Sequence, residues 1–138
     1  MMDLKEMNRR NIEEFRANRG KVGGRFEGAP MLLLTTTGAK SGKSYTTPLM
    51  YLPDGDRIVV FASKGGAPSH PDWYRNLVAN PKVTVEVGAD TREMTATSAT
   101  GPERDELYTR QAEAYPQFAE YQQKTTRQIP VVILERES

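Results

Sequence analysis

The sequence predicts an α+β protein built on a small antiparallel β-barrel with helices packed outside it. Six short segments have the apolar or alternating pattern of β-strands, and turn sequences join most neighbouring segments, which favours an antiparallel sheet. The 138 residues have the size of one domain, and six strands at this length favour a closed or split barrel. We therefore expect a six-stranded antiparallel split β-barrel with flanking helices.

The chain begins with the pattern of a helix. Ile12 and Phe15 continue an apolar stripe that starts at Leu4, at helical spacing. Because the stripe is thin, we expect this helix on the surface of the protein. We divide the chain accordingly into an N-terminal helix, residues 1–20, and a barrel domain, residues 21–138.

Strands and short helices account for most of the remaining chain. Residues 53–56 (PDGD) form a turn between two strand-like runs and predict a hairpin. Helices are predicted over residues 69–79, where Ser69 and Asp72 suit a capping box, and in two pieces over residues 103–124. The six expected strands are residues 31–37, 46–52, 57–63, 82–88, 92–99 and 130–135.

Composition excludes several classes of protein. Hydrophobic residues make up 37% and charged residues 27%, with a net charge of +1, which is typical of a folded chain rather than a disordered one. The absence of cysteine excludes disulfides, thiolate metal sites and cysteine nucleophiles. The N-terminus lacks a signal-peptide pattern and no stretch approaches the ~20 apolar residues of a membrane span, so we expect a cytoplasmic protein.

Positive charge is concentrated near the N-terminus. Residues 1–25 contain seven lysines and arginines against four acidic residues. This excess suits a solvated helix face, and it also suits contact with an anionic membrane surface or with nucleic acid. No nucleic-acid motif accompanies it, so nucleic acid is not an expected partner. Peripheral contact with the inner face of the membrane stays open.

Residue counts and spacing exclude three familiar active sites. His70 is the only histidine, so we expect neither a metal site nor a Ser-His-Asp hydrolase. Residues 38–44 (GAKSGKS) have three residues between the glycines, whereas a nucleotide-binding P-loop has four. The residues that follow have the pattern of a strand rather than a helix, so we do not expect an ATPase.

Two glycine-containing segments are candidates for ligand binding. Residues 38–44 combine flexible backbone with Lys40 and Lys43, which suits an anion and equally suits a solvated turn. Residues 62–66 (ASKGG) place a hydroxyl and an ammonium group at the end of an apolar strand.

Aromatic residues form two further candidates. Residues 71–76 (PDWYRN) place a tryptophan and a tyrosine at the start of a helix, where anions are favoured, although both rings could instead anchor the core. Tyr115, Phe118 and Tyr121 are spaced to share one helix face. Such a stripe is either a wall of a substrate pocket or core packing.

The order and separation of these segments resemble those of a known family. Residues 31–52 (MLLLTTTGAKSGKSYTTPLMYL), 58–77 (IVVFASKGGAPSHPDWYRNL) and 80–85 (NPKVTV) look like the deazaflavin-dependent nitroreductases. That family is similar to split-barrel flavin reductases and binds coenzyme F420. The resemblance runs from about Gly24 to the C-terminus. It implies an oxidoreductase that transfers a hydride from reduced F420 to a quinone, an enone or a nitroaromatic acceptor.

The resemblance also implies roles for individual residues. The glycine-rich loop would contact the phosphate tail of the cofactor, the turn at residues 62–65 would hold the deazaflavin ring, and the helix start would complete the pocket. The implied cofactor-binding residues are Lys40, Ser41, Gly42, Tyr45, Thr46, Thr47, Pro48, Leu49, Ala62, Ser63, Lys64, Gly65, Asp72, Trp73, Tyr74, Arg75 and Asn76. The implied substrate-binding residues are Tyr115, Phe118 and Tyr121, and the implied catalytic residues are Ser63, Tyr115 and Tyr121.

Three positions depart from the family pattern. Ala39 and Tyr45 stand where relatives often carry arginine, so fewer cations would surround the cofactor tail. Phe118 stands where some relatives have tyrosine, and it cannot donate a proton. The alternatives are therefore a protein that binds deazaflavin, flavin or heme without turnover, and a split-barrel reductase that uses FMN. A homodimer is compatible with the sequence.

Overall fold

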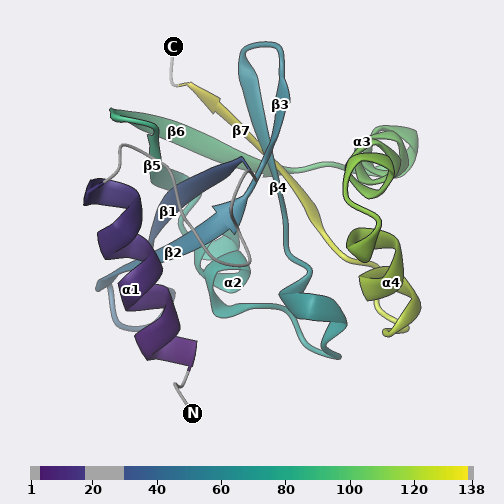
Figure 1. Ribbon diagram of the computed structural model, residues 1–138, viewed down its shortest axis with the longest axis horizontal. Helices are drawn as coiled ribbons and strands as arrows, with labels where there is room; N and C mark the ends of the chain where they lie inside the picture. Colours follow the sequence, from purple (N-terminus) through teal and green to yellow (C-terminus); the bar gives the residue numbers. More distant parts are fainter. Residues whose placement is uncertain (1–3, 18–29, 137–138) are drawn as a thin grey trace.

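The computed structural model of the chain describes residues 4–17 and 30–136 (Figure 1). Its elements, in order, are helix α1 (Leu4–Ala17), strands β1 (Met31–Thr37), β2 (Ser44–Met50), β3 (Leu52–Asp54) and β4 (Arg57–Phe61), the 3-10 helix η2 (Lys64–Gly66), helix α2 (Asp72–Ala79), strands β5 (Lys82–Val87) and β6 (Asp90–Ser98), helices α3 (Gly101–Ala114) and α4 (Gln117–Gln123), and strand β7 (Val131–Arg136).

The seven described strands form one sheet in the order β2-β1-β5-β6-β7-β4-β3. Every pair of neighbouring strands is antiparallel. The predicted hairpin is present, because Asp54 of β3 pairs with Arg57 of β4. The prediction of an antiparallel barrel with flanking helices is confirmed, and the strand count needs one correction.

A single residue, Tyr51, separates β2 from β3, although these two strands lie at opposite edges of the sheet. The sheet must therefore curl until its edges are close, and β2 does contact β4. The prediction of one strand over residues 46–52 was wrong. The segment divides at Tyr51, because its first part pairs with β1 whereas Leu52 pairs with Val59 of β4.

The inside of the barrel is filled by alternate residues of its strands. Because side chains alternate across a strand, every second residue of β1, β4, β5, β6 and β7 points inward. Helix α2 adds Trp73 and Leu77 to this cluster and so closes one end of the barrel. The strand residues of the cluster are Leu32, Leu34, Ile58, Val60, Val83, Val85, Met94, Ala96, Val132 and Leu134.

Helices cover the outer face of the sheet on two sides (Figure 1). Helices α3 and α4 pack on β4 and β7, where Phe61 meets the rings of Tyr108 and Phe118 at 5.8 and 5.7 Å between ring centres. Helix α1 packs on β1 through Phe15. Strands β1, β4 and β7 are therefore buried on both faces over most of their length.

The C-terminal half of α1 packs on the sheet through Ile12 and Phe15. Phe15 is buried against Leu33, and Arg16 bonds both carboxylate oxygens of Glu86 on β5, at 3.1 and 2.9 Å. The predicted boundary between residues 1–20 and 21–138 lies outside the described residues. None of the helices that the structure describes is long and apolar enough to cross a membrane.

The strand registers gather several connections at one end of the barrel. The C-terminal ends of β1, β4 and β6 pair with the N-terminal ends of β2, β5 and β7. The β1–β2 loop, the segment from β4 to α2 and the segment from α4 to β7 therefore meet at this end. The β3–β4 turn and the C-terminal end of β7 lie at the other end (Figure 1).

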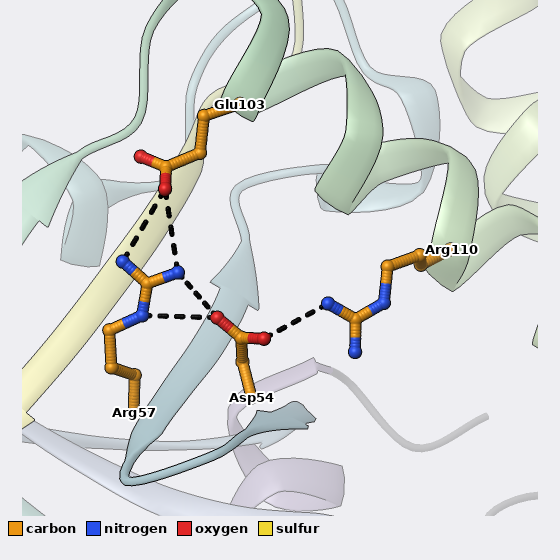
Figure 2. A network of polar contacts seen from close by, with 4 residues as sticks. All are labelled: Asp54, Arg57, Glu103 and Arg110. Carbon is orange, nitrogen blue, oxygen red and sulfur yellow. Dashed lines mark hydrogen bonds and ion pairs between the residues drawn. The ribbon is translucent and has the colours of Figure 1, made fainter.

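A charged network ties the β3–β4 hairpin to α3 (Figure 2). Asp54 accepts hydrogen bonds from Arg57 Nε at 3.0 Å and from Arg110 Nη1 at 3.0 Å, and Arg57 also contacts Glu103 at 3.4 Å. These two arginine hydrogen bonds lower the pKa of the Asp54 carboxyl group. Asp54 therefore links the short edge strand to the helix that covers the neighbouring strands.

Replacing Asp54 by asparagine should lower the free energy of unfolding at pH 7, because it weakens the ion pairs with Arg57 and Arg110. The loss should be only about 1 kcal/mol, since these ion pairs are partly exposed to solvent. A lowered carboxyl pKa stabilises the fold above the unfolded value of about 3.9 and loses that contribution as pH falls through the folded-state value. Urea unfolding at pH 7 and below pH 4 measures both effects. The control is Asp56→Asn, at the exposed hairpin turn. Equal losses in the two variants would contradict a role for the network.

Candidate functional site

A cleft of about 580 Å³ opens between the β1–β2 loop and the start of α2. Both walls come from the barrel end described above, and the floor includes Trp73. Nine of the predicted cofactor-binding residues line it, together with two residues of the loop, Gly38 and Ala39, that were not predicted as contacts. The nine are Lys40, Ser41, Tyr45, Thr46, Thr47, Asp72, Trp73, Arg75 and Asn76.

The β1–β2 loop is tightly closed by its own backbone. The amide of Gly38 donates to the carbonyl of Lys43 at 2.7 Å, and that of Gly42 donates back to Gly38 at 3.1 Å. Gly42 has a positive φ of 71°, which favours glycine. Ser41 Oγ accepts from the amide of Lys43 at 3.2 Å and shares a hydrogen bond with the Tyr45 hydroxyl at 3.1 Å. The loop is thus a defined turn rather than an open glycine segment.

Asn76 of α2 holds the loop against the helix. Its Oδ1 accepts a hydrogen bond from the amide of Ala39 at 3.0 Å, and its Nδ2 donates to Thr36 Oγ1 at 3.4 Å. One turn later, Asn80 Nδ2 donates to the carbonyl of Thr37 at 3.4 Å. The two asparagines therefore fix the distance between the walls of the cleft.

Positive charge dominates the cleft. Lys40 and Arg75 line it and Lys43 lies in the same loop, whereas Asp72 is the one acidic residue in the lining. Arg75 reaches Asp72 at 3.7 Å, but both side chains are largely exposed and the pair is weak. Neither lysine forms an ion pair within the described part of the chain. Together with the N-terminus of α2, these groups favour an anionic ligand.

Trp73 and Tyr74 have different positions at the start of α2. Trp73 is 7% exposed and belongs to the barrel core, yet its ring also lines the cleft, so both interpretations of this residue apply. Tyr74 does not line the cleft; its hydroxyl lies 3.3 Å from Ser98 Oγ and its ring packs beside His70. The helix begins at Asp72 after an extended Pro71, so the predicted capping box from Ser69 was wrong.

The predicted ring-binding turn lies beyond the end of β4. The strand ends at Phe61 rather than at Ser63, and the 3-10 helix η2 follows. Ser63 is right-handed helical (φ −76°, ψ −40°), whereas Lys64 is left-handed, with φ of 47°. No other described residue except glycine has a positive φ. The Ser63 hydroxyl has no hydrogen-bond partner in the described part of the chain.

Arg127, which sequence reasoning missed, holds this turn. It follows α4, and its guanidinium donates to the carbonyl oxygens of Ser63 and Ala67, each at 2.8 Å. Arg127 belongs to no recognisable motif and lies in a polar segment. Its role becomes visible only from its position in the structure. His70 is half-buried and accepts a hydrogen bond from Arg127 Nη1 at 3.0 Å.

The predicted aromatic wall lies on α4 and beside it. Phe118 is 5% exposed and packs among Phe61, Tyr108 and the adjacent Tyr121, so in this structure it is part of the outer core. Tyr115 and Tyr121 are partly exposed at the edge of that core, and their hydroxyls have no partner among the described residues. Helix α4 packs against η2, and none of the three residues lines the cleft.

The predicted site residues therefore fall into two neighbouring groups at one end of the barrel. The cleft gathers the loop and the helix start, and the second group gathers the turn at residues 62–65 with the α4 aromatics. Pro48 and Leu49 continue β2 away from the cleft lining. Within the described residues, no cluster of three or more histidines and carboxylates is placed to hold a metal ion.

The sequence profile of the F420H(2)-dependent quinone reductase family matches residues 6–136. The chain belongs to this family. The F420H(2)-dependent quinone reductase of Mycobacterium tuberculosis strain H37Rv is 42% identical over 128 residues, which are 88% of this chain and 85% of the relative. The resemblance to deazaflavin-dependent reductases inferred from the sequence is confirmed.

Solved structures of similar proteins have the same fold. The F420-H2-dependent reductase FDR-A is 48% identical, with a TM-score of 0.71 over 77% of this chain and 94% of that one. A structure described as a domain-swapped dimer is 44% identical, with a TM-score of 0.73 over 92% of this chain and 93% of that one. Fold and family thus agree.

Gly66 is expected to be the least replaceable glycine of the site. It has φ of 84°, and an added Cβ would lie 2.7 Å from the backbone oxygen of Tyr121. Gly66→Ala should therefore lower the free energy of unfolding by more than Gly42→Ala, which has a similar φ but open space around it. A left-handed conformation alone costs about 1–3 kcal/mol, and the difference between the variants isolates the close approach of α4. Chemical denaturation measures both, and equal losses would contradict this packing.

Proposed function

We propose that the chain is an F420H2-dependent reductase that reduces a quinone, with enones and nitroaromatics as further acceptors of the same electronic type. One observation carries the proposal: in a member of this family, the cationic glycine-rich loop and the start of α2 form one cleft at the same barrel end as the Ser63–Lys64 turn. The cofactor site would span these two groups of residues.

The residues of the cleft fit the tail of the cofactor. F420 carries a phosphate and a glutamate tail, which need cations and backbone donors. Lys40 and Arg75 supply charge in the lining, and Lys43 adds a third cation in the same loop. Asp72 opposes them only at the rim, where its side chain is 92% exposed. A single exposed ion pair contributes little binding free energy, so the affinity for the tail should come from the combined effect of the three cations.

The residues beyond β4 fit the ring. Reduced F420, when bound, supplies the hydride, and the protein supplies position and electrostatics. The Ser63 hydroxyl and the amides of the turn would bind the polar edge of the ring, and Trp73 would support the link between ring and tail. Lys64 adds a cation without an ion pair in the described part of the chain.

The α4 side would receive the acceptor. Tyr115 and Tyr121 present unpartnered hydroxyls at the edge of an apolar cluster, which suits a flat acceptor with carbonyl oxygens. Phe118 would act by fixing the two tyrosines.

If either tyrosine hydroxyl donates the proton, Tyr115→Phe or Tyr121→Phe should lower kcat with little change in the KM for the acceptor. An unchanged kcat in both variants would assign the proton to Ser63 or to solvent.

The departures at positions 39 and 45 shape the tail site. Ala39 offers its amide to Asn76, and Tyr45 offers its hydroxyl to Ser41, so neither replaces the charge of an arginine. Because of these departures, two alternatives need to be tested in the assay. One is a protein that binds the cofactor without turnover, and the other is an FMN-dependent enzyme.

We propose a homodimer as the assembly, since one similar structure is described as a domain-swapped dimer. Light scattering during size-exclusion chromatography tests this, and a monomer at all concentrations would reject it. We propose no membrane contact, because Ile12 and Phe15 of α1 already pack on the sheet.

The direct test of activity follows the oxidation of reduced F420 by absorbance, with menadione as acceptor and with an enone and a nitroimidazole in parallel. We expect turnover that depends on both enzyme and acceptor. Tight binding of F420 without turnover across the panel would favour the binding protein. Turnover with FMN but not with F420 would favour the flavin enzyme.

Lys40→Ala should weaken F420 binding about two- to fivefold, the effect expected for one exposed ion pair of up to about 1 kcal/mol. The loss should shrink as salt is raised, because salt screens exposed charges. Lys82→Ala is the control, since Lys82 is an exposed lysine at the same barrel end but outside the cleft lining. Equilibrium titration measures both, and equal effects would remove Lys40 from the tail site.

A further inference from the structure

Arg127 bonds the turn that follows β4 at four points. Its Nη1 donates to the carbonyl of Ala62 at 3.1 Å and to His70 Nδ1 at 3.0 Å. Its Nη2 donates to the carbonyl of Ser63 at 2.8 Å, and its Nε donates to the carbonyl of Ala67 at 2.8 Å. A guanidinium presents its donors in a fixed plane, so these contacts set the orientation of the peptide groups and not only their distance.

The orientation of two carbonyls determines where two amides point. In a trans peptide the N–H lies opposite the C=O. Because Arg127 draws the carbonyls of Ala62 and Ser63 towards itself, the amides of Ser63 and Lys64 turn away from it. Neither amide donates to a partner within the described part of the chain.

The backbone around these amides has the shape of an anion-binding nest. Ser63 is right-handed helical and Lys64 is left-handed, and this succession makes neighbouring N–H groups converge on one side. The Ser63 hydroxyl lies on the same residue and is also unpartnered among the described residues. The turn therefore presents several donors to one electron-rich group.

Arg127 has no carboxylate partner in the described ranges. Its charge is balanced only by carbonyl dipoles, which it further polarises, so the N–H ends of the same peptides become better donors. Arg127 is partly buried, and holding a cation there without a carboxylate partner costs free energy unless something is gained from it. The gain would be a pair of amides, those of Ser63 and Lys64, already oriented to bind a negatively polarised oxygen of a ligand.

We propose that Arg127 is a positioning residue for the cofactor ring: it orients the amides of Ser63 and Lys64 towards a carbonyl oxygen at the polar edge of the deazaflavin. This inference rests on the proposed function, because it needs the ring to bind at this turn. Arg127 does not touch the ring and acts through the peptide groups that it holds.

His70 makes the arrangement sensitive to pH. Its Nδ1 accepts from Arg127 and so carries no proton, and its other charged and titratable neighbours are Arg75 and Tyr74 of α2. Burial lowers the pKa of His70, and Arg127 and Arg75 lower it further. Protonation would place a second cation against Arg127. The contact is therefore intact at neutral pH and is lost as pH falls through the pKa of His70.

The test compares Arg127→Lys and Arg127→Ala with Arg104→Lys. Arg104 is a buried arginine that likewise bonds a backbone carbonyl, that of Ile129 at 2.6 Å, but it does not touch the turn. All three variants should lose stability. Only the Arg127 variants should weaken F420 binding, by about three- to tenfold, the effect expected for the loss of one hydrogen bond to a neutral oxygen. The lysine variant keeps the charge and keeps the test valid if the alanine variant does not fold.

Two readouts do not need the cofactor. Because His70 is the only histidine, its NMR titration is unambiguous, and its pKa should rise towards 6.5 when Arg127 is replaced by alanine. Hydrogen exchange at Gly66 and Ala67, whose amides bond Ser63 and Lys64, should quicken in the Arg127 variants and not in Arg104→Lys.

The pH profile completes the experiment. F420 affinity of the unmodified protein should fall as pH falls through the pKa measured for His70, and His70→Asn should remove that pH-dependent step. Any change in the ionisation of F420 itself affects the unmodified protein and His70→Asn equally, so it cancels when the two pH profiles are compared. If Arg127→Lys binds F420 with the same affinity as the unmodified protein, the positioning role of Arg127 is overturned while the proposed function still stands. Failure of the unmodified protein to bind F420 would overturn the proposed function together with this inference.

Discussion

The whole arrangement depends on one short connection, in which Tyr51 alone joins strands at opposite edges of the sheet. One residue cannot span an open seven-stranded sheet, because strands lie about 4.8 Å apart. The sheet must curl, and its inner face becomes a closed core of aliphatic side chains. The Tyr51 amide bonds the carbonyl of Pro30, just before β1, at 3.2 Å and so joins the connection to the first strand.

Closure of the barrel explains how distant segments form one site. Curling and antiparallel register bring the β1–β2 loop, the turn after β4 and the chain before β7 to the same end. Helix α2 closes that end with Trp73 and Leu77, and its polar side then faces the loop. Asn76 and Arg127 bond backbone groups of the two turns that, under the proposed function, would face the cofactor. The site is thus held by side chains that contact main chain rather than ligand.

The fold could be predicted because its signals are local. Alternation in residues 82–87, turn residues at 53–56 and the prolines that follow α2 and α3 mark elements directly. The division at Tyr51 could not be predicted, because the apolar pattern runs through it and only the change of strand partner separates β2 from β3. The start of α2 was misplaced because Ser69 is a residue type that often caps helices but lies in a bend, and the helix begins only at Asp72, after an extended Pro71.

The site was predictable to the extent that motifs carried it. Nine residues of the resemblance do line one cleft. Phe118 was not distinguishable from a pocket residue, since a helical stripe of rings has the same spacing in a core and in a wall. Arg127 gave no signal, because its partners are carbonyl oxygens, which every residue possesses.

The central claim is that the cleft and the neighbouring turn bind F420 in preference to a flavin. Trp73 is the only tryptophan, and it lines the cleft, so its fluorescence reports binding there. Parallel titration with F420 and FMN should give saturable quenching by both or by F420 alone, with F420 the tighter ligand, and Arg75→Ala should weaken the F420 curve. Quenching by FMN at lower concentration than F420, or no change with F420, would contradict the account.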